Sequence, residues 1–232
     1  MPFMTPQIDP RVVALAPGFR ALSIRVEGAA IVDRRVGTQA LARACQSVAA
    51  GGAPWAQAHL SAWDQVFKRF GAKPSRTPCS AQALRKRVLR EGSLPSIDPV
   101  VDLYNAISVE YAIPVGGEDL AAYEGAPRLI IADGTELFDT MKEGVPGQER
   151  PEPGEVVWCD DRGVTCRRWN WRQGTRTRLS AESGQMWFIL ESLPEMPLAV
   201  LQEAGDRLMD GLRQMMPAAR IESALLASPG GS

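Results

Sequence analysis

The sequence predicts an α+β fold. Segments with helical periodicity dominate residues 1–125, strand-like segments dominate residues 126–193, and an amphipathic helix follows at about 195–217. Helices and strands do not alternate as they do in βαβ proteins, which argues against a doubly wound parallel sheet. A length of 232 residues, 45% of them hydrophobic and 23% charged, suffices for a sizeable core, and we expect residues 1–232 to form a single domain.

Turn and cap signals divide the first half. Polar and apolar residues alternate around 22–26, as in a half-buried strand. The Asp98-Pro99 pair is a strong start signal for a helix, because aspartate caps the first turn and proline is tolerated at the first helical position. The predicted extended segments are 11–15 and 22–26, and the predicted helices are 38–50, 55–70, 80–90 and 99–113.

The second half contains mostly strand-like segments. Asp161-Arg162-Gly163 is a plausible hairpin turn between two of them. Residues 144–155 include three prolines and are predicted to form a loop. The predicted strands are 128–132, 155–159, 164–171 and 185–191, and residues 198–216 are predicted to form the closing amphipathic helix.

Charge is unevenly distributed along a chain whose formal net charge is only −1. Residues 66–90 contain eight basic residues and no acid, and residues 162–178 contain six basic residues and no acid. The remaining 12 basic residues stand against 27 acidic ones. Two such stretches can attract a polyanion to one face of a near-neutral protein. The alternative is that they are ordinary solvated faces of helices and strands.

Familiar catalytic and cofactor-binding motifs are missing. The sequence has no P-loop, GxGxxG, GxSxG or HExxH motif. Its one histidine, His59, cannot form a multi-histidine metal site and is predicted to be structural, and its four cysteines lack paired zinc spacing. We expect no metal and no cofactor. Any chemistry must then rely on carboxylates, amides, hydroxyls, backbone N–H groups and water, which suits an activated substrate such as an ester.

Residues 100–123 form the first candidate segment. Tyr104 and Ser108 lie on one helical stripe, and Asn105 and Ser108 are spaced to share a helix face. Residues 114–119 are predicted to be a loop in which Gly116 and Gly117 allow close approach to a ligand, since they carry no Cβ. The alternative is a glycine-rich turn that merely reverses the chain.

Residues 166–173, with the sequence CRRWNWRQ, form the second candidate segment. If this segment is a strand, its side chains alternate between two faces. Tryptophans bracketed by arginines are suited to stacking on bases while neutralising phosphates. One face would carry Arg168, Asn170 and Arg172, and the other Arg167, Trp169, Trp171 and Gln173. The alternative is a core strand with tryptophans inside and cations outside.

Four stretches together resemble the B3/B4 domain, the editing module of the bacterial phenylalanyl-tRNA synthetase β subunit, and more closely its freestanding bacterial relatives. They extend over most of the chain. They are AWDQVFKRFGAKPSRTPCSAQAL, LPSIDPVVDLYNAISVEYAIPVGGEDL, LIIADGTELF and GEVVWCDDRGVTCRRWNWRQ.

The resemblance implies a β-sandwich-like core flanked by helices, with a pocket between its two halves. In the synthetase this pocket hydrolyses tyrosine wrongly esterified to the phenylalanine tRNA, and a freestanding copy implies editing in trans. Asn105 matches the asparagine of the synthetase's VTN-type stretch. Gly116 stands where synthetase modules usually carry a pocket histidine, and residues 168–173 offer no counterpart of the glutamate that recognises the tyrosine hydroxyl. The amino acid removed can therefore differ from tyrosine.

The same resemblance gives each candidate residue a role. Asn105 and the amides of Gly116 and Gly117 would position the ester carbonyl and a water, while Glu118 or Asp119 would orient the α-amine or the water. The remaining substrate-binding candidates are Tyr104, Ser108, Trp169, Asn170, Trp171, Arg172 and Gln173, with Trp169 or Trp171 stacking on the terminal adenine. The expected contacts to tRNA phosphates are Lys68, Arg69, Lys73, Arg76, Arg85, Lys86, Arg167 and Arg168.

Two other functions stay open. The chain could be a tRNA- or amino-acid-binding module without hydrolytic activity, or an enzyme acting on another small ester or metabolite. The expected partners are a misacylated tRNA and its amino acid. No run of about 18 apolar residues predicts a membrane span, and no apolar segment near the N-terminus predicts a signal peptide, so we expect a cytoplasmic protein.

Overall fold

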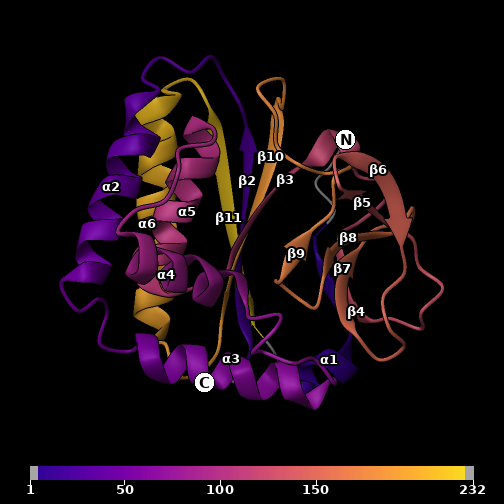
Figure 1. The fold of residues 1–232 in the computed structure, drawn as a ribbon. Coiled ribbons are helices and arrows are strands. Elements are labelled where there is room, and N and C mark those ends of the chain that lie inside the picture. Colours follow the sequence, from indigo (N-terminus) through magenta and orange to yellow (C-terminus); the bar gives the residue numbers. More distant parts are fainter. Residues whose placement is uncertain (1–4, 228–232) are drawn as a thin grey trace.

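A computed structural model describes residues 5–227, so the first four and last five residues of the predicted domain lie outside the described part. Its centre is an antiparallel sheet, here called the central sheet, with strand order β11-β2-β10-β3 (Figure 1). The four strands are β2 (Arg20–Glu27), β3 (Val115–Asp119), β10 (Gln185–Ser192) and β11 (Arg220–Ala227).

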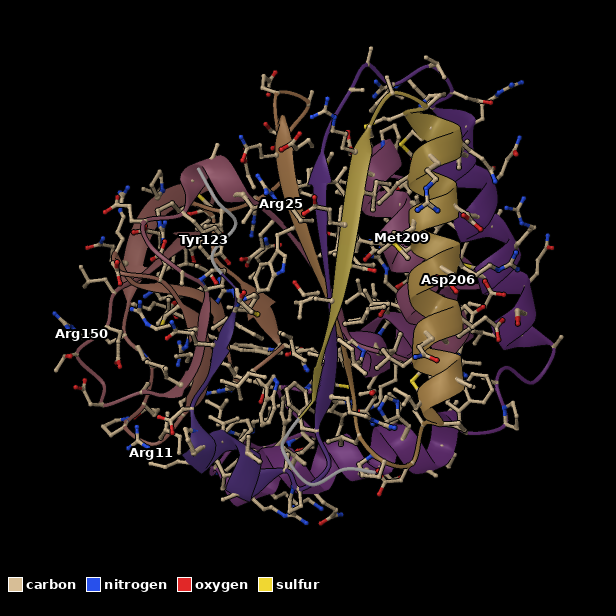
Figure 2. All side chains as sticks on the ribbon, turned by 180° about the vertical axis from the view of Figure 1, so that it is seen from behind. Arg11, Arg25, Tyr123, Arg150, Asp206 and Met209 are labelled. Carbon is tan, nitrogen blue, oxygen red and sulfur yellow. The ribbon has the colours of Figure 1, made fainter. Side chains whose placement is uncertain are left out.

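Helices cover one face of the central sheet. Apolar side chains of β2, β3 and β10 pack there against α5 and α6, in a core that includes Ile24, Phe188 and Leu208. Figure 2 shows Met209 of α6 in this layer between the helix and the sheet. The longer helices are α2 (Arg35–Ala49), α3 (Ala56–Arg69), α4 (Ser80–Glu91), α5 (Pro99–Tyr111) and α6 (Leu198–Met215).

A second sheet, here called the outer sheet, faces the other side of the central sheet (Figure 1). A separate aromatic-rich core, with Trp63, Trp158 and Trp187 among its members, lies between them and against α1 and α3. The outer sheet consists of β1 (Gln7–Ile8), β4 (Arg128–Ile131), β5 (Phe138–Lys142), β6 (Val145–Glu149), β7 (Val156–Cys159), β8 (Val164–Arg167) and β9 (Arg172–Gln173). The order helices, central sheet, outer sheet confirms the α+β class and its two-sheet core.

Most predicted elements are present within a few residues of their expected ends. Asp98 caps α5 by accepting a hydrogen bond from Val100 N at 2.9 Å. The hairpin turn at 161–163 is held by Asp160, whose Oδ1 accepts from Arg162 N and Gly163 N at 3.0 Å. Both signals are local, which explains why the sequence alone reveals them.

The predicted strand at 11–15 is wrong. These residues belong to helix α1 (Pro10–Leu15), which Asp9 caps by accepting from Arg11 N at 2.8 Å. The start signal is the same Asp-Pro pair that correctly predicted α5. Helix α1 is too short to show a helical pattern of apolar residues, because only Val12 of its six residues is buried in the core.

Two predictions about the candidate segments are also wrong. Residues 115–119 are strand β3 rather than a loop, and neither Gly116 nor Gly117 has a positive φ. The strand predicted at 164–171 ends at Arg167, because Arg168 and Trp169 adopt left-handed backbone conformations with φ of 46° and 65°. The chain therefore turns, and the predicted two-face alternation stops there.

The longer strands β5, β6 and β11 were missed, as were the two-residue strands β1 and β9. The predicted loop at 144–155 contains β6, which forms a hairpin with β5 through Glu143 and Gly144, both at positive φ. Strand β11 follows α6 and pairs with β2 along its full length. These strands carry little period-2 alternation, so pairing with neighbours rather than local pattern determines them. In the described part of the chain, no helix combines the length and apolar character needed to cross a bilayer.

Replacing Gly37 with alanine is expected to destabilise the protein. Gly37 lies in α2 where it crosses α5, and an added Cβ would overlap the carbonyl oxygen of Pro99. Forcing these two helices apart should lower the free energy of unfolding by about 2–3 kcal/mol, measured by urea denaturation. Gly147→Ala in β6 is the matched control, since nothing lies near the added Cβ there. Equal stability of the two variants would contradict this account of the helix crossing.

Candidate functional site

A cavity of about 280 Å³ lies between the central sheet, the outer sheet and helices α4 and α5. Its lining combines both candidate segments, although they are some fifty residues apart in the chain. The lining residues are Ser80, Ala83, Leu84, Tyr104, Asn105, Val115, Gly116, Gly117, Glu118, Trp158, Cys166, Trp169, Asn170, Trp171, Gln173, Trp187, Ile189 and Glu191. Nine of the twelve predicted catalytic or substrate-binding residues are among them.

One face of the central sheet forms the floor of this cavity. In the antiparallel register Glu118 lies opposite Trp187 and Gly116 opposite Ile189, and all four side-chain positions point away from the helices. An added Cβ at Gly116 would meet only Ile189, at 3.3 Å, so glycine leaves the middle of the floor open. Gly117 points the other way, where Tyr104 packs on it so closely that a Cβ would lie 2.8 Å from the ring.

Asn105 reaches the cavity from α5. Its side chain is half-buried, and it makes no side-chain hydrogen bond within residues 5–227. Gln173 reaches the same cavity from β9 and donates to the carbonyl oxygen of Gly117 at 2.9 Å. The amide of Gln173 therefore fixes the edge of β3, whereas the amide of Asn105 remains available to a ligand.

Glu118 is a buried carboxyl group at one end of the floor. Only 5% of the residue is exposed, and its Oε2 atom has no hydrogen-bond partner in the described structure. Burial raises the pKa of Glu118 to about 8, against a smaller lowering by the Thr165 hydroxyl and the Arg176 charge. A carboxyl group in this state is largely protonated at neutral pH when the cavity is empty.

Glu191 is a second buried carboxyl group, which the sequence analysis missed. Its oxygens accept hydrogen bonds from the indole N–H groups of Trp158 and Trp169 and from the Asn170 amide, each at 2.9 Å. Burial raises the pKa of Glu191 to about 7, although these three donors favour the ionised form. An acid in the otherwise apolar run of β10 was the available sequence signal, because a strand buried on both faces does not accommodate a charge without partners.

His59 is structural, as predicted. Its Nδ1 lies 2.9 Å from the carbonyl oxygen of Ala112, and Nε2 accepts from Trp63 Nε1 at 3.2 Å and from Leu193 N at 3.1 Å. Both ring nitrogens are thus occupied. Burial lowers the pKa of His59 to about 4, so the ring is neutral at physiological pH.

The two tryptophans of the second segment occupy different environments. Trp169 is fully buried, with its ring edge-to-face against Phe19 and Trp63 at centroid distances of 5.0 and 5.3 Å. It is therefore unsuited to stacking on an adenine. Trp171 is only half-buried, borders the cavity, and lies 4.7 Å from the Arg168 guanidinium.

Three predicted site residues lie outside the cavity lining. Asp119 caps a short 3-10 helix by accepting from Ala121 N at 2.9 Å, and it also accepts from the Ser183 hydroxyl at 2.7 Å. Ser108 is buried in α5 on a different part of the helix. Arg172 points toward β5, where it donates to the Thr140 hydroxyl at 2.7 Å. The structure therefore does not support roles for these three at the reacting centre.

Two of the predicted phosphate contacts are buried. Arg85 donates to the carbonyl oxygen of Val109 at 2.6 Å, and Arg167 forms ion pairs with Glu155 and Glu149, both at 2.9 Å. Internal partners occupy these guanidinium groups, so surface contacts with RNA are not supported for them. The other cations of the prediction are exposed or half-buried: Lys68, Arg69, Lys73, Arg76, Lys86 and Arg168.

Metal ligation has no obvious place in this site. In residues 5–227, no group of three or more histidine, cysteine, aspartate or glutamate side chains is arranged to hold a metal ion. Cys166 borders the cavity, but burial raises the pKa of its thiol well above the ordinary value. The cavity therefore presents carboxyl, amide, hydroxyl and indole groups to a ligand.

Comparison with known proteins places this site in a family. The sequence profile of the B3/4 domain matches residues 62–205, which contain both candidate segments and every residue of the cavity lining. The chain belongs to the B3/4 domain family. In this B3/4 domain the matched region extends from α3 to α6 and includes both sheets in part.

Among solved structures, the chain is similar to an N-terminal fragment of the phenylalanyl-tRNA synthetase beta-subunit from Pyrococcus horikoshii. The two share 11% sequence identity and superpose with a TM-score of 0.48 over 97% of this chain. The chain spans 54% of that fragment, about half its length. No curated protein sequence matches the chain.

The free energy of unfolding of this B3/4 domain is expected to fall as the pH rises. Folded Glu118 has a pKa of about 8, above the ordinary 4.5, so the folded state keeps a proton that the unfolded state has lost. This contribution to the free energy of unfolding is complete below the ordinary pKa of 4.5 and is lost as the pH rises through the folded-state pKa of about 8. Between pH 7 and 8 the loss is about 1 kcal/mol, measured by chemical denaturation at several pH values.

The Glu118→Gln variant should lose most of this pH dependence. Glu191, with a pKa of about 7, leaves only a small residual slope over the same interval. His59 contributes little there, since it is neutral in the folded state and mostly neutral in the unfolded state above pH 7. A slope in Glu118→Gln as steep as that of the unmodified protein would show that Glu118 is not the titrating group.

Proposed function

We propose that this B3/4 domain hydrolyses the ester bond of a misacylated tRNA, acting in trans after the tRNA has left its synthetase. The observation that supports this most directly is the free amide of Asn105 in the same cavity as the Gly116-Gly117 edge of β3. An aminoacyl ester is already activated, so a protein needs mainly to hold the ester, a water and an oxyanion site in register. Acting on charged tRNA, the protein would work in the cytoplasm.

The hydrogen-bond phase of β3 supports an oxyanion site at Gly117. Glu191 N donates to the carbonyl oxygen of Pro114 at 3.0 Å, so the backbone groups of residues 114, 116 and 118 point toward β10. Those of Gly117 and Asp119 point to the opposite edge, where Asp119 N donates to Thr177 O at 2.9 Å and Gly117 O accepts from Gln173. The Gly117 N–H therefore lies on the edge of β3 that is not covered by β10.

The proposed reaction uses these groups without a covalent intermediate. Water attacks the ester carbonyl carbon, the new C–O bond forms as the C–O bond to the ribose breaks, and a proton from the water ends on the ribose oxygen. Gly117 N–H and the Asn105 amide would donate to the carbonyl oxygen as it gains negative charge. Removing one such donor from an enzyme typically costs 10²- to 10³-fold in rate.

Helix α4 supports the approach of a tRNA end to the cavity. Ser80, Ala83 and Leu84 of this helix line the cavity, and Arg87 continues the same stripe one turn further along. The exposed Lys86 and Arg90 lie on the same helix. Trp171, half-exposed beside Arg168, offers a face on which the terminal adenine can stack.

A binding module without hydrolytic activity is the second candidate. It is favoured by Gly116, which stands where synthetase editing modules usually carry a histidine, and by His59, whose ring nitrogens are both occupied and which is not among the lining residues. The two functions differ in turnover. A module of this kind would bind tRNA or an amino acid and leave every ester intact.

Asn105→Ala is expected to lower kcat/KM for tRNA deacylation by about 100-fold or more. The measurement is release of labelled amino acid from a panel of misacylated tRNAs, with the unmodified protein identifying the substrate. Gln46→Ala, an exposed amide on α2, is the matched control and should keep the unmodified rate. If no tRNA in the panel is hydrolysed but some are bound, the binding module is the correct function. Full activity of Asn105→Ala would overturn the assignment of the reacting centre.

Replacing Lys73, Arg76 and Lys86 together with alanine is expected to weaken tRNA binding and reduce its salt dependence. If all three contact phosphates, the slope of log Kd against log salt should fall by about 2–3. Filter binding at several salt concentrations measures this. A control triple variant of Arg150, Arg213 and Arg220 removes equal charge from other exposed positions. Identical slopes for both triple variants would remove the argument for a tRNA surface formed by α4 and the segment that precedes it.

A further inference from the structure

We propose that the cavity selects amino acids whose side chain ends in an ammonium group, and that Glu118 binds this group. The proposal rests on the proposed function, because it identifies the aminoacyl group of the substrate. Four features of the cavity support it: the position of Glu118 along the floor, the contact of helix α4 with the Glu191 end, the unpartnered acceptors of the lining, and the lack of a basic side chain there.

The floor of the cavity has two acidic ends. Glu118 lies at the level of Trp187, Gly116 at the level of Ile189, and Glu191 at the level of Pro114, in successive two-residue steps of the ladder. Each step is about 7 Å along a strand. The reacting centre at Gly116 is therefore in the middle, with Glu118 about 7 Å to one side and Glu191 about 7 Å to the other.

The tRNA end is expected to enter from the side of Glu191. Ser80, the first residue of α4, donates its backbone N–H to Asn170 O at 3.1 Å, and the Asn170 side chain donates to Glu191 at 2.9 Å. The first turn of helix α4 thus borders the Glu191 end, and the exposed cations follow further along the same helix. An ester held at Gly116 then directs its ribose toward α4 and its amino acid side chain toward Glu118.

The two acidic ends differ in their hydrogen bonding. Glu191 accepts from three donors and holds Trp158, Trp169 and Asn170 in place. Glu118 has an oxygen without a partner although it is 95% buried. A buried carboxyl oxygen without a hydrogen-bond partner is unfavourable, so an empty site is incomplete at Glu118 and a donor from the ligand would complete it.

The cavity contains no cation of its own to supply that donor. No lysine or arginine is among its lining residues, whereas indole and phenol rings form much of its wall. Arg178, which lies opposite Glu118 in an antiparallel bridge, is exposed to solvent. Arg176, whose charge lowers the pKa of Glu118, is held by Asp160 at 2.8 Å and by Ala122 O at 2.6 Å. Aromatic faces and a free carboxyl oxygen together match an ammonium group.

Length and charge favour an ammonium over a hydroxyl. A side chain of lysine's length spans roughly 6 Å from Cα to nitrogen at ordinary bond lengths, close to the 7 Å step from Gly116 to Glu118. An ammonium offers three donors and compensates the charge that Glu118 gains when it ionises, whereas a hydroxyl offers one donor and cannot compensate that charge. The side chain is therefore expected to carry a primary amine.

Four small amides provide the test: lysinamide, Nα-acetyl-lysinamide, norleucinamide and Nα-acetyl-norleucinamide. Lysinamide carries both the side-chain ammonium and the α-ammonium, and Nα-acetyl-lysinamide carries only the side-chain ammonium. Norleucinamide carries only the α-ammonium, and Nα-acetyl-norleucinamide carries neither. Calorimetry should show that each lysine compound binds about ten-fold or more tightly than its norleucine partner, the size of one charge-assisted hydrogen bond. In Glu118→Gln this preference should fall below about three-fold, while Glu182→Gln, an exposed control, should keep it.

A second readout uses the unmodified protein alone. The other titratable or polar groups that face Glu118 are Arg176 and Asp160, Tyr104 and Cys166, the hydroxyls of Thr165 and Thr177, and Arg178 in the bridge opposite it. Glu191, whose pKa is about 7, lies two ladder steps away on the same floor. Burial raises the pKa of Tyr104 to about 12 and that of Cys166 well above its ordinary value, so neither titrates near pH 7. Binding of Nα-acetyl-lysinamide at pH 7 should release up to about one proton from Glu118 to the buffer.

Several results would overturn the proposal. Norleucinamide binding as tightly as lysinamide would show that the α-ammonium alone is recognised, and a larger difference between tyrosinamide and phenylalaninamide would show that a hydroxyl is read. A lysine preference unchanged in Glu118→Gln, or binding without proton release, would place the ammonium elsewhere. These binding measurements are independent of the deacylation assay on the tRNA panel. If the protein hydrolysed a tRNA esterified with a neutral amino acid and showed no preference for lysine, the proposed function would stand and this inference would be refuted.

Discussion

The carboxylate of Glu191 joins the two sheets at the candidate site. It extends from β10 of the central sheet and accepts the indole N–H groups of Trp158, on β7, and Trp169, just after β8, as well as the Asn170 amide. No cation lies among these partners. The three N–H donors must therefore offset the desolvation of the buried carboxylate. The turn that carries Trp169 and Asn170, and hence the wall of the cavity opposite β10, depends on this arrangement.

Other contacts between the sheets keep the cavity from collapsing. Tyr123, labelled in Figure 2, lies with its ring 6.0 Å from that of Trp187 and donates its hydroxyl to Thr165 of β8 at 3.2 Å. Trp187 donates to the Ser23 hydroxyl at 2.9 Å. Rings whose polar atoms are all satisfied fill space rigidly. The cavity remains open next to Gly116, because the floor has no side chain at that position.

The site combines a backbone edge and an amide with carboxyl groups in unusual states. An amide and an exposed strand edge can orient an ester and a water, but they cannot supply a strong base. Such a site suits a bond that is already labile, as in the ester hydrolysis proposed above. In the proposal above, the buried acid that carries an unpartnered oxygen, Glu118, distinguishes one amino acid from another rather than taking part in the reaction.

The sequence by itself determined the features that depend on near neighbours in the chain. The cap at Asp98, the turn at 161–163, the helix that carries Tyr104 and Asn105, and the structural role of His59 were all predicted correctly, because each follows from local geometry or residue count. The predicted sharing of one face by Asn105 and Ser108 was wrong, since only Asn105 reaches the cavity. Tertiary structure alone decided the left-handed turn at Arg168 and Trp169, the burial of Arg85 and Arg167, and the pairing of Glu191 with Trp158, 33 residues away. The reason is physical: a buried polar group is stable only next to partners from other elements, and the sequence does not show which elements will meet.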